Sequence, residues 1–273
     1  MLSKIKPEHL DQYLDLCRKY AVFDIPHLRD AANALIFRCN HKAYNLDHLK
    51  EMDELENRWY SSLQKDQFNP DYSVYGSIYY FCEAWYCWKI ASRITLVSMT
   101  KISKNLGKSI IDDMSDVTSI VDLGCGSGYT TSALTELFPG AYVTGTNFED
   151  SYQYKIALEL GTQYGFQMLP EVQNYSDLVF ASEYFEHILD PIGHLKHVLD
   201  VCEPKYVITA NTFSQPAIGH FNKYVLNGLL VSGATISREF GKTMRARGYK
   251  HIDANCWNNR PMYWKKTDTV SLF

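Results

Sequence analysis

The 273-residue sequence lacks the features that mark several classes of protein. Its seven cysteines are scattered and none forms a C-x-x-C pair, which argues against a disulfide framework and against a cysteine-type zinc site. The net charge of −4 shows no excess of basic residues, so it does not indicate nucleic acid as a partner. No apolar signal core follows Met1, and the most hydrophobic stretch, residues 78–99, contains charged residues that favour a buried helix over a membrane span. We therefore expect a cytoplasmic protein without a membrane segment.

Glycine is absent from the first 75 residues, which fits a helical segment. Apolar residues recur at helical spacing over residues 10–17 and 46–63. A further helix, rich in aromatic residues, is expected over residues 77–100. We predict that residues 1–104 form an N-terminal α-helical cap.

Beyond residue 116, short apolar runs alternate with helical stretches. Strands are expected at residues 118–123, 141–146, 166–169, 177–181, 206–210, 251–256 and 262–266. Helices are expected at residues 129–137, 150–164, 191–201 and 237–247. This alternation predicts an α/β fold built on a parallel sheet.

Asp122 ends the first of these strands, and Gly124, Gly126 and Gly128 follow it before a helix begins at Tyr129. Glycine lets a ligand approach the backbone closely, and the N-terminus of the helix adds unpaired N–H groups. The spacing fits neither the dinucleotide motif G-x-G-x-x-G nor the P-loop motif. The string Asp-Leu-Gly-Cys-Gly-Ser-Gly instead resembles the first motif of the class I S-adenosylmethionine (SAM) dependent methyltransferases. The alternative is a glycine-rich turn in another α/β fold.

This resemblance implies a Rossmann-like, seven-stranded, mostly parallel sheet with helices on both faces, formed by residues 105–273 and closed by an antiparallel hairpin. It also implies SAM as the cofactor, with its methionine part against the glycine turn. An aromatic residue ahead of the first motif often covers the cofactor in this family, which suggests Tyr72 or Tyr75. The cofactor-binding residues that it implies are Asp122, Gly124, Cys125, Gly126, Gly128, Asn147 and Glu183.

Asn147 follows the second strand, where most members of the family have an acid that accepts hydrogen bonds from the ribose hydroxyls. Asparagine can accept through its carbonyl oxygen and can also donate, so the ribose position can be kept. The alternative role for Asn147 is a turn or a helix cap. For the adenine ring, Gln167, Glu171 and Asn174 are open candidates.

After the fourth strand, residues 183–191 read E-x-x-E-H-x-x-D-P. This string resembles one found in many small-molecule methyltransferases and in some that act on RNA. The Asp/Asn-Pro-Pro-aromatic signature of DNA amino-methyltransferases and the Pro-Cys nucleophile of cytosine-C5 enzymes are both missing. We predict that the protein transfers a methyl group from SAM to an oxygen or nitrogen atom of a small molecule or nucleotide.

Glu183, Glu186 and His187 would share one face if this stretch were helical. Together with His220, after the fifth strand, they could bind Mg²⁺, Mn²⁺ or Zn²⁺. The set resembles the metal sites of ubiquinone-pathway O-methyltransferases and of small-RNA 3′-terminal 2′-O-methyltransferases. There a metal would bind vicinal hydroxyls and lower the pKa of the attacking oxygen. Alternatively, the two acids only shape the pocket.

Without a metal, His187 and His220 are the best candidates for a general base, since imidazole titrates near neutrality, and Glu186 completes the set of candidate catalytic residues. His194 and His197 are expected at the surface. Two other functions stay open. One is a nucleic-acid methyltransferase whose helical cap binds the substrate, and the other is a non-catalytic SAM-binding module.

Overall fold

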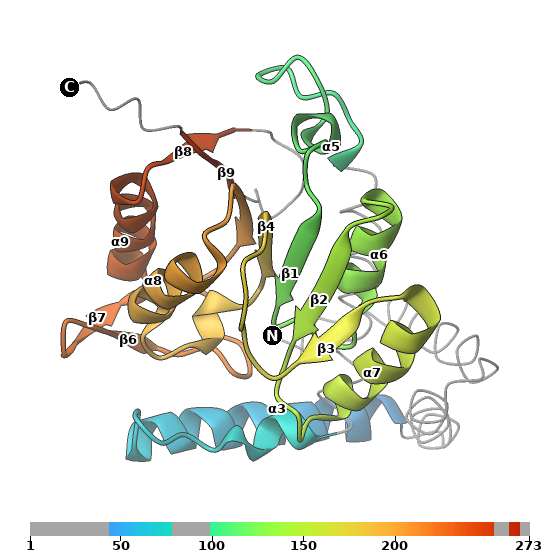
Figure 1. The fold of residues 1–273 in the computed structure, drawn as a ribbon. Coiled ribbons are helices and arrows are strands. Elements are labelled where there is room, and N and C mark those ends of the chain that lie inside the picture. The colour runs from blue at the N-terminus through green and yellow to red at the C-terminus, as the bar shows by residue number, and fades with distance from the viewer. Residues whose placement is uncertain (1–43, 78–98, 254–261, 268–273) are drawn as a thin grey trace.

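A twisted central sheet organises the computed structural model, which describes residues 44–77, 99–253 and 262–267 (Figure 1). Its strands are β1 (Ser119–Leu123), β2 (Tyr142–Thr146), β3 (Gln167–Leu169), β4 (Leu178–Ser182), β5 (Tyr206–Ala210), β8 (Tyr249–Ile252) and β9 (Met262–Lys266). They lie in the order β3-β2-β1-β4-β5-β9-β8. The first five are parallel, while β9 is antiparallel to both β5 and β8. The predicted α/β fold with a seven-stranded, mostly parallel sheet is therefore confirmed.

Helices connect the parallel strands and cover the sheet on both sides. They are α6 (Tyr129–Leu137), α7 (Tyr152–Tyr164), α8 (Pro191–Cys202) and α9 (Gly233–Ala246). The strand order runs one way from β1 to β3 and the other way from β4 to β5. Because such crossovers are right-handed, the pair α6–α7 and the pair α8–α9 lie on opposite faces (Figure 1). The order reverses between β1 and β4, where open α/β sheets bind their ligands.

Local sequence signals set the ends of these helices. Ser151 caps α7, since its hydroxyl accepts a hydrogen bond from the backbone N–H of Tyr154, and Gly165 ends the helix in the left-handed conformation. Asp190 caps α8 in the same way, and Pro191 occupies the first turn. The Asp-Pro pair of the E-x-x-E-H-x-x-D-P string is thus the start of a helix.

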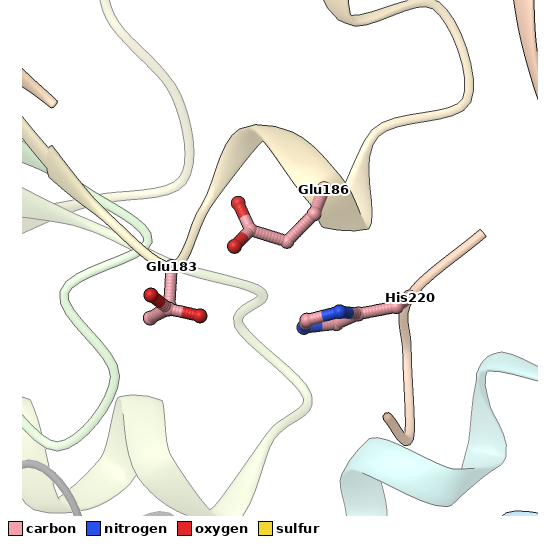
Figure 2. Close-up of side chains that lie close together, drawn as sticks. All are labelled: Glu183, Glu186 and His220. Carbon is pink, nitrogen blue, oxygen red and sulfur yellow. The ribbon is translucent and has the colours of Figure 1, made fainter. Parts of the chain in front are cut away.

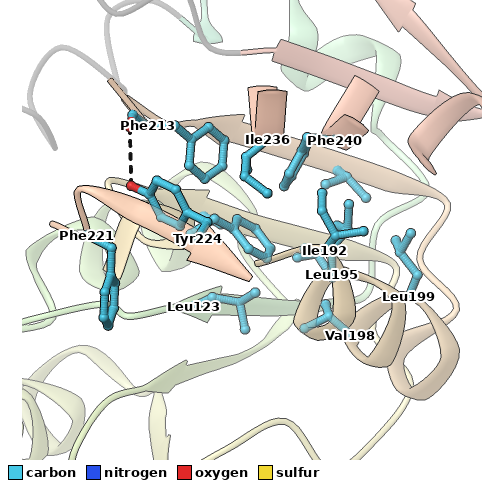
Figure 3. Packing of buried hydrophobic residues seen from close by; sticks show 14 of the residues in the cluster. Leu123, Ile192, Leu195, Val198, Leu199, Phe213, Phe221, Tyr224, Ile236 and Phe240 are labelled. Carbon is cyan, nitrogen blue, oxygen red and sulfur yellow. Dashed lines mark hydrogen bonds between the residues drawn. The ribbon is translucent and has the colours of Figure 1, made fainter. Parts of the chain in front are cut away.

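A two-stranded hairpin, β6 (Lys223–Leu226) and β7 (Leu229–Ser232), lies between β5 and α9 and was not predicted. Its turn is Asn227-Gly228, with both residues at positive φ, which is a strong local signal for a hairpin. Tyr224 of β6 is buried, and its hydroxyl donates to the carbonyl of Phe213 (Figure 3). The hairpin therefore closes the apolar cluster formed with α8 and α9.

The last large helix, α9, begins at Gly233, four residues earlier than predicted. Ser232 caps it by accepting from the backbone N–H of Thr235. Gly233 itself packs against the carbonyl of Phe213, where a Cβ atom would collide. Such a close approach needs glycine, which sequence periodicity alone does not reveal.

Within residues 44–77, ahead of the sheet, lie α3 (Tyr44–Lys65) and the 3-10 helix η2 (Tyr72–Gly76). A short helix, α5 (Ile110–Asp113), leads into β1. Helix α3 lies along the end of the sheet to which the parallel strands point (Figure 1). Its buried residues Leu55, Trp59 and Leu63 join the main apolar cluster, as their helical spacing predicts.

The other helices predicted for the cap fall on residues 1–43 and 78–98, outside the described residues. The boundary between residues 104 and 105 stays a prediction.

Candidate active site

A pocket of about 270 Å³ opens at the carboxyl ends of the parallel strands, where the strand order reverses. Its walls come from the loops after β1, β2, β3 and β4, together with η2 and the first turns of α7 and α8. The lining residues are Tyr75, Gly124, Thr146, Asn147, Phe148, Ser151, Gln153, Pro170, Glu171, Glu183, Tyr184, His187, Ile188 and His194. Of the site residues predicted from the sequence, Gly124, Asn147, Glu183 and His187 therefore line one pocket.

The glycine turn forms one wall of this pocket. Gly124 has a φ of 60°, and its Cα lies so close to the ring of Tyr184 that a Cβ would collide with it. Gly128 adopts φ 84° and packs against α7, where a Cβ would lie 2.8 Å from Phe166. Both glycines permit close packing: Gly124 lets the Tyr184 ring lie against the turn, and Gly128 lets the start of α6 approach α7.

Two other predicted cofactor residues, Asp122 and Cys125, lie behind the turn. Asp122 is buried and accepts a hydrogen bond of 2.8 Å from the hydroxyl of Thr131 in α6. Burial raises the pKa of Asp122 to about 7, although the bond from Thr131 opposes this. The thiol of Cys125 points toward Met168. Neither residue is among the described residues that line the pocket. Both therefore support the glycine turn from behind.

Asn147 links the end of β2 to the glycine turn. Its Nδ2 donates to the carbonyl of Gly126 at 3.0 Å, and its Oδ1 accepts from the backbone N–H of Phe148. The donated bond needs an amide, because a carboxylate at this position has no proton to give. Asn147 also lines the pocket, so both roles considered from the sequence, turn support and contact with a ligand, are compatible with its position.

The two acids after β4 lie close together on an unusual piece of backbone. Glu183 adopts a φ of 51°, a conformation that L-residues rarely take, two residues before the 3-10 helix η3 (Phe185–His187) begins. Glu186 is fully buried, and its Oε1 accepts from the backbone N–H of Thr212 at 2.9 Å. The Thr212 hydroxyl lies 3.0 Å from Glu183 Oε2 and 3.1 Å from Glu186 Oε1.

The second carboxylate oxygen of Glu186, Oε2, is buried and has no hydrogen-bond partner among the described residues. Burial, and then the neighbouring carboxylate of Glu183, raise the pKa of Glu186 to about 8. An unpaired buried carboxylate oxygen is costly. A proton or a cation at this oxygen would remove that cost.

His220 presents its imidazole ring to this acidic pair from the opposite side (Figure 2). Its Nδ1 lies 2.8 Å from the carbonyl oxygen of Gln215, which can only accept, so Nδ1 carries the proton and Nε2 keeps its lone pair. Burial lowers the pKa of His220, which keeps the ring neutral near pH 7. Each of Glu183, Glu186 and His220 offers an atom within 4.8 Å of the others.

His187, predicted as a fourth metal ligand, is not a member of this group. The stretch is a 3-10 helix that begins after Glu183, so the expected α-helical face does not form. The ring of His187 lies edge-on to His220, with centroids 4.6 Å apart, and its Nδ1 is hydrogen-bonded to the Tyr75 hydroxyl at 2.8 Å. Burial and the neighbouring His220 hold the pKa of His187 well below its usual value.

An aromatic cluster from the N-terminal segment covers one side of the pocket. Tyr75 stacks with Tyr72 and lies against Phe148, whose ring is 56% exposed. Helix α3 fixes the other side, since Trp59 Nε1 donates to the carbonyl of His220 at 2.7 Å. The N-terminal segment thus reaches both histidines of the site.

The prediction from the sequence was wrong for one residue of the pocket, His194. His194 was expected at the surface, but it lines the pocket, and its Nε2 is hydrogen-bonded to the Tyr184 hydroxyl at 2.9 Å. The signal that could have found it is its place in the first turn of α8, directly after the β4 loop. Of the three adenine candidates, Glu171 lines the pocket, while Gln167 is bonded to Tyr142 and Asn174 is exposed.

The strand order, the glycine turn at its reversal and the acids after β4 are together the architecture of a class I SAM-dependent methyltransferase. A family model described as a methyltransferase domain matches residues 90–252. The chain therefore belongs to the methyltransferase-domain family, and SAM is the cofactor that this membership implies. No curated protein matches the sequence.

Three solved structures resemble the fold at low sequence identity. PigF with SAH has a TM-score of 0.55 and 13% identity, over 80% of this chain and 72% of that one. Human N-acetylserotonin methyltransferase in complex with SAM has a TM-score of 0.53 and 13% identity, over 81% and 70%. The mitomycin 7-O-methyltransferase MmcR has a TM-score of 0.50 and 14% identity, over 89% and 69%. At these identities the likeness concerns the fold.

No helix within residues 44–77, 99–253 and 262–267 combines the length and the apolar character that crossing a membrane requires. The cytoplasmic location stays a prediction.

Proposed function

We propose that the protein transfers a methyl group from SAM to a hydroxyl oxygen of a small molecule, with a divalent cation held by Glu183, Glu186 and His220. The observation that carries this proposal is the convergence of two carboxylates and one imidazole, with Glu186 Oε2 buried and unpartnered among the described residues. An oxygen acceptor also agrees with what structurally similar proteins are named for, among them the mitomycin 7-O-methyltransferase.

The pocket fits the cofactor. Gly124 lines it at the turn after β1, Asn147 offers an amide at the end of β2, and Phe148 and Pro170 present apolar surface beyond it. Bound SAM supplies an electrophilic methyl group through its sulfonium. The protein's task is then to hold the acceptor oxygen in line with that methyl and to exclude water.

The acidic pair and His220 also fit a divalent cation. Carboxylate oxygens and a neutral imidazole suit Mg²⁺, Mn²⁺ or Zn²⁺. The Nδ1–H of His220 is fixed by a backbone carbonyl, which is the usual outer-shell partner of a histidine ligand. A bound cation would lower the pKa of a coordinated hydroxyl.

His187 is placed to receive the proton of the acceptor. Its ring lines the pocket beside the acidic pair, and it is neutral near pH 7 because burial lowers its pKa. The Tyr75 hydroxyl holds the ring through Nδ1. A neutral imidazole at a fixed angle is suited to general-base catalysis.

The proposal is tested with purified protein, labelled SAM and a fraction of small molecules from a cell extract. We expect label to appear in a small-molecule product, to fall at least tenfold with a chelator, and to return with one of the three cations. Metal content measured after dialysis gives an independent readout: about one ion per chain in the wild type and none in His220→Ala. Full activity with the chelator would remove the cation from the proposal, and the absence of any labelled product would favour a non-catalytic SAM-binding module.

A further inference from the structure

Gln153 is a buried polar residue of the pocket to which the proposed chemistry gives no task. It is the second residue of α7, it is 5% exposed, and it lines the pocket. Its side-chain Nε2 is buried and has no hydrogen-bond partner among the described residues. A buried amide donor is normally paired, so a donor without a partner on a residue that lines a pocket points to a ligand.

The position of Gln153 identifies which part of a ligand it would meet. It shares the pocket wall with Phe148 after β2 and with Pro170 and Glu171 after β3. Glu183 and His187 line the pocket from the stretch after β4, which lies on the far side of β1 from β3. On the proposed function, with the methionine part of SAM at the turn after β1 and the ribose at Asn147, the base lies toward β3 and α7.

The chemistry of the carboxamide selects among the parts of a nucleoside. A glutamine side chain donates and accepts from adjacent atoms, which matches the paired acceptor and donor on an edge of adenine. The exposed carboxylate of Glu171 can only accept, so it cannot pair with a ring nitrogen of adenine. The flanking Phe148 and Pro170 offer flat apolar surfaces against which a purine ring can lie.

We propose that Gln153 is the residue that recognises the adenine base, with Nε2 donating to a ring nitrogen. The proposal rests on the proposed function, because it takes SAM as the cofactor. Gln153 would then make the adenine contact for which the sequence offered Gln167, Glu171 and Asn174 as candidates.

The test measures the binding of S-adenosylhomocysteine (SAH) and of its 1-deaza, 3-deaza and 7-deaza analogues, each of which replaces one ring nitrogen by C–H. We expect the wild type to bind one analogue about tenfold more weakly than SAH, the size expected for one lost hydrogen bond to a buried donor. In Gln153→Met, SAH itself should bind about tenfold more weakly, and the deficit of that analogue should shrink to less than threefold. If the variant no longer discriminates between SAH and that analogue, the side chain of Gln153 and the replaced ring nitrogen interact energetically.

Two variants complete the design. Gln153→Glu keeps the size of the side chain but cannot donate, so it should lose the discrimination as well. Gln167→Met is the matched control, because Gln167 is bonded to Tyr142 and is outside the pocket lining, and it should keep the wild-type pattern. Thermal unfolding without ligand checks that each variant is folded, and the wild-type panel does not depend on any variant.

A wild type that is indifferent to all three analogues, or a Gln153→Met variant that keeps the full deficit, would overturn the inference while leaving SAM as the cofactor. If the wild type does not bind SAH at all, the proposed function fails, and the inference fails with it.

Discussion

Replacing Glu186 with glutamine should stabilise the metal-free protein. Glu186 is fully buried beside Glu183, and its Oε2 has no partner among the described residues. Folding without a cation therefore requires either a buried charge or the uptake of a proton. Glutamine has nearly the same shape, and its carbonyl can still accept from the backbone N–H of Thr212 while its amide group faces Glu183.

The size of the effect follows from the pKa of Glu186, which rises from 4.5 to about 8 on folding because of burial and of the neighbouring Glu183. An acid whose folded pKa is raised costs nothing below pH 4.5 and destabilises progressively as the pH rises toward 8. At pH 7 this costs about 3 kcal/mol of unfolding free energy. For a chain of this length, relief of that cost corresponds to a rise in melting temperature of roughly 5 °C.

The assay is thermal and denaturant unfolding in a chelator at half-unit steps from pH 5 to 8.5, with wild type and Glu186→Gln side by side. The difference between the two proteins should grow with pH and level off near pH 8, because contributions of the other titrating groups cancel. Adding the cation should bring the wild type back to about the stability of the variant at pH 7. The wild type gains about 3 kcal/mol at a hundred times the dissociation constant, whereas the variant gains little.

Glu171→Gln is the matched control, since Glu171 lines the same pocket but is exposed. It should change neither the pH dependence nor the response to metal. A Glu186→Gln variant that is less stable than the wild type at pH 8 in chelator, or that shows the same pH slope, would refute the reasoning from burial.

Three further substitutions, one of them with a control outside the pocket, probe the rest of the site. Gly124→Ala should lower SAH affinity at least tenfold, because its Cβ collides with a neighbouring ring, whereas Gly165→Ala, also at positive φ but with open space, should cost only about 1 kcal/mol of stability and leave SAH affinity unchanged. Tyr75→Phe removes the hydroxyl bonded to His187 and should lower kcat about tenfold with KM for SAM unchanged, as measured in steady state. Asn147→Asp restores the acid usual in relatives but removes a donated bond to the glycine turn, so calorimetry should show weaker SAH binding; a tighter complex would contradict this.

Local sequence signals were enough to predict most of the sheet. The strand that ends at Asp122 and the turn that follows it are contiguous in sequence, so apolar pattern and glycine spacing locate them together. The hairpin at Asn227-Gly228 also carries a local signal, but it forms a separate two-stranded sheet that the alternation of strands and helices does not predict. The start of α9 was missed for another reason, since the closeness of Gly233 to Phe213 is a tertiary fact.

The acidic motif shows where pattern reasoning stops. Spacing placed Glu183, Glu186 and His187 on one helical face, which assumes 3.6 residues per turn from Glu183 onward. The backbone instead passes through a left-handed residue at Glu183 and then a 3-10 helix, so His187 turns toward Tyr75 while His220 joins the two acids. Conformations of this kind are stabilised by surrounding contacts, here the backbone bond from Glu183 to Ala210, and no short sequence window contains those contacts.

His187 and His220 are contacted by side chains of an N-terminal segment that lies outside the residues matched by the family model. The matched region begins at residue 90, yet Trp59 fixes the carbonyl of His220, and Tyr75 fixes the ring of His187. The sheet supplies the turn and strand ends that any member of the fold needs for the cofactor. On the proposed function, the acceptor side is therefore set by α3 and η2. Differences in the acceptor between this protein and others of the fold should accordingly arise from the N-terminal segment, because the same sheet can serve many acceptors.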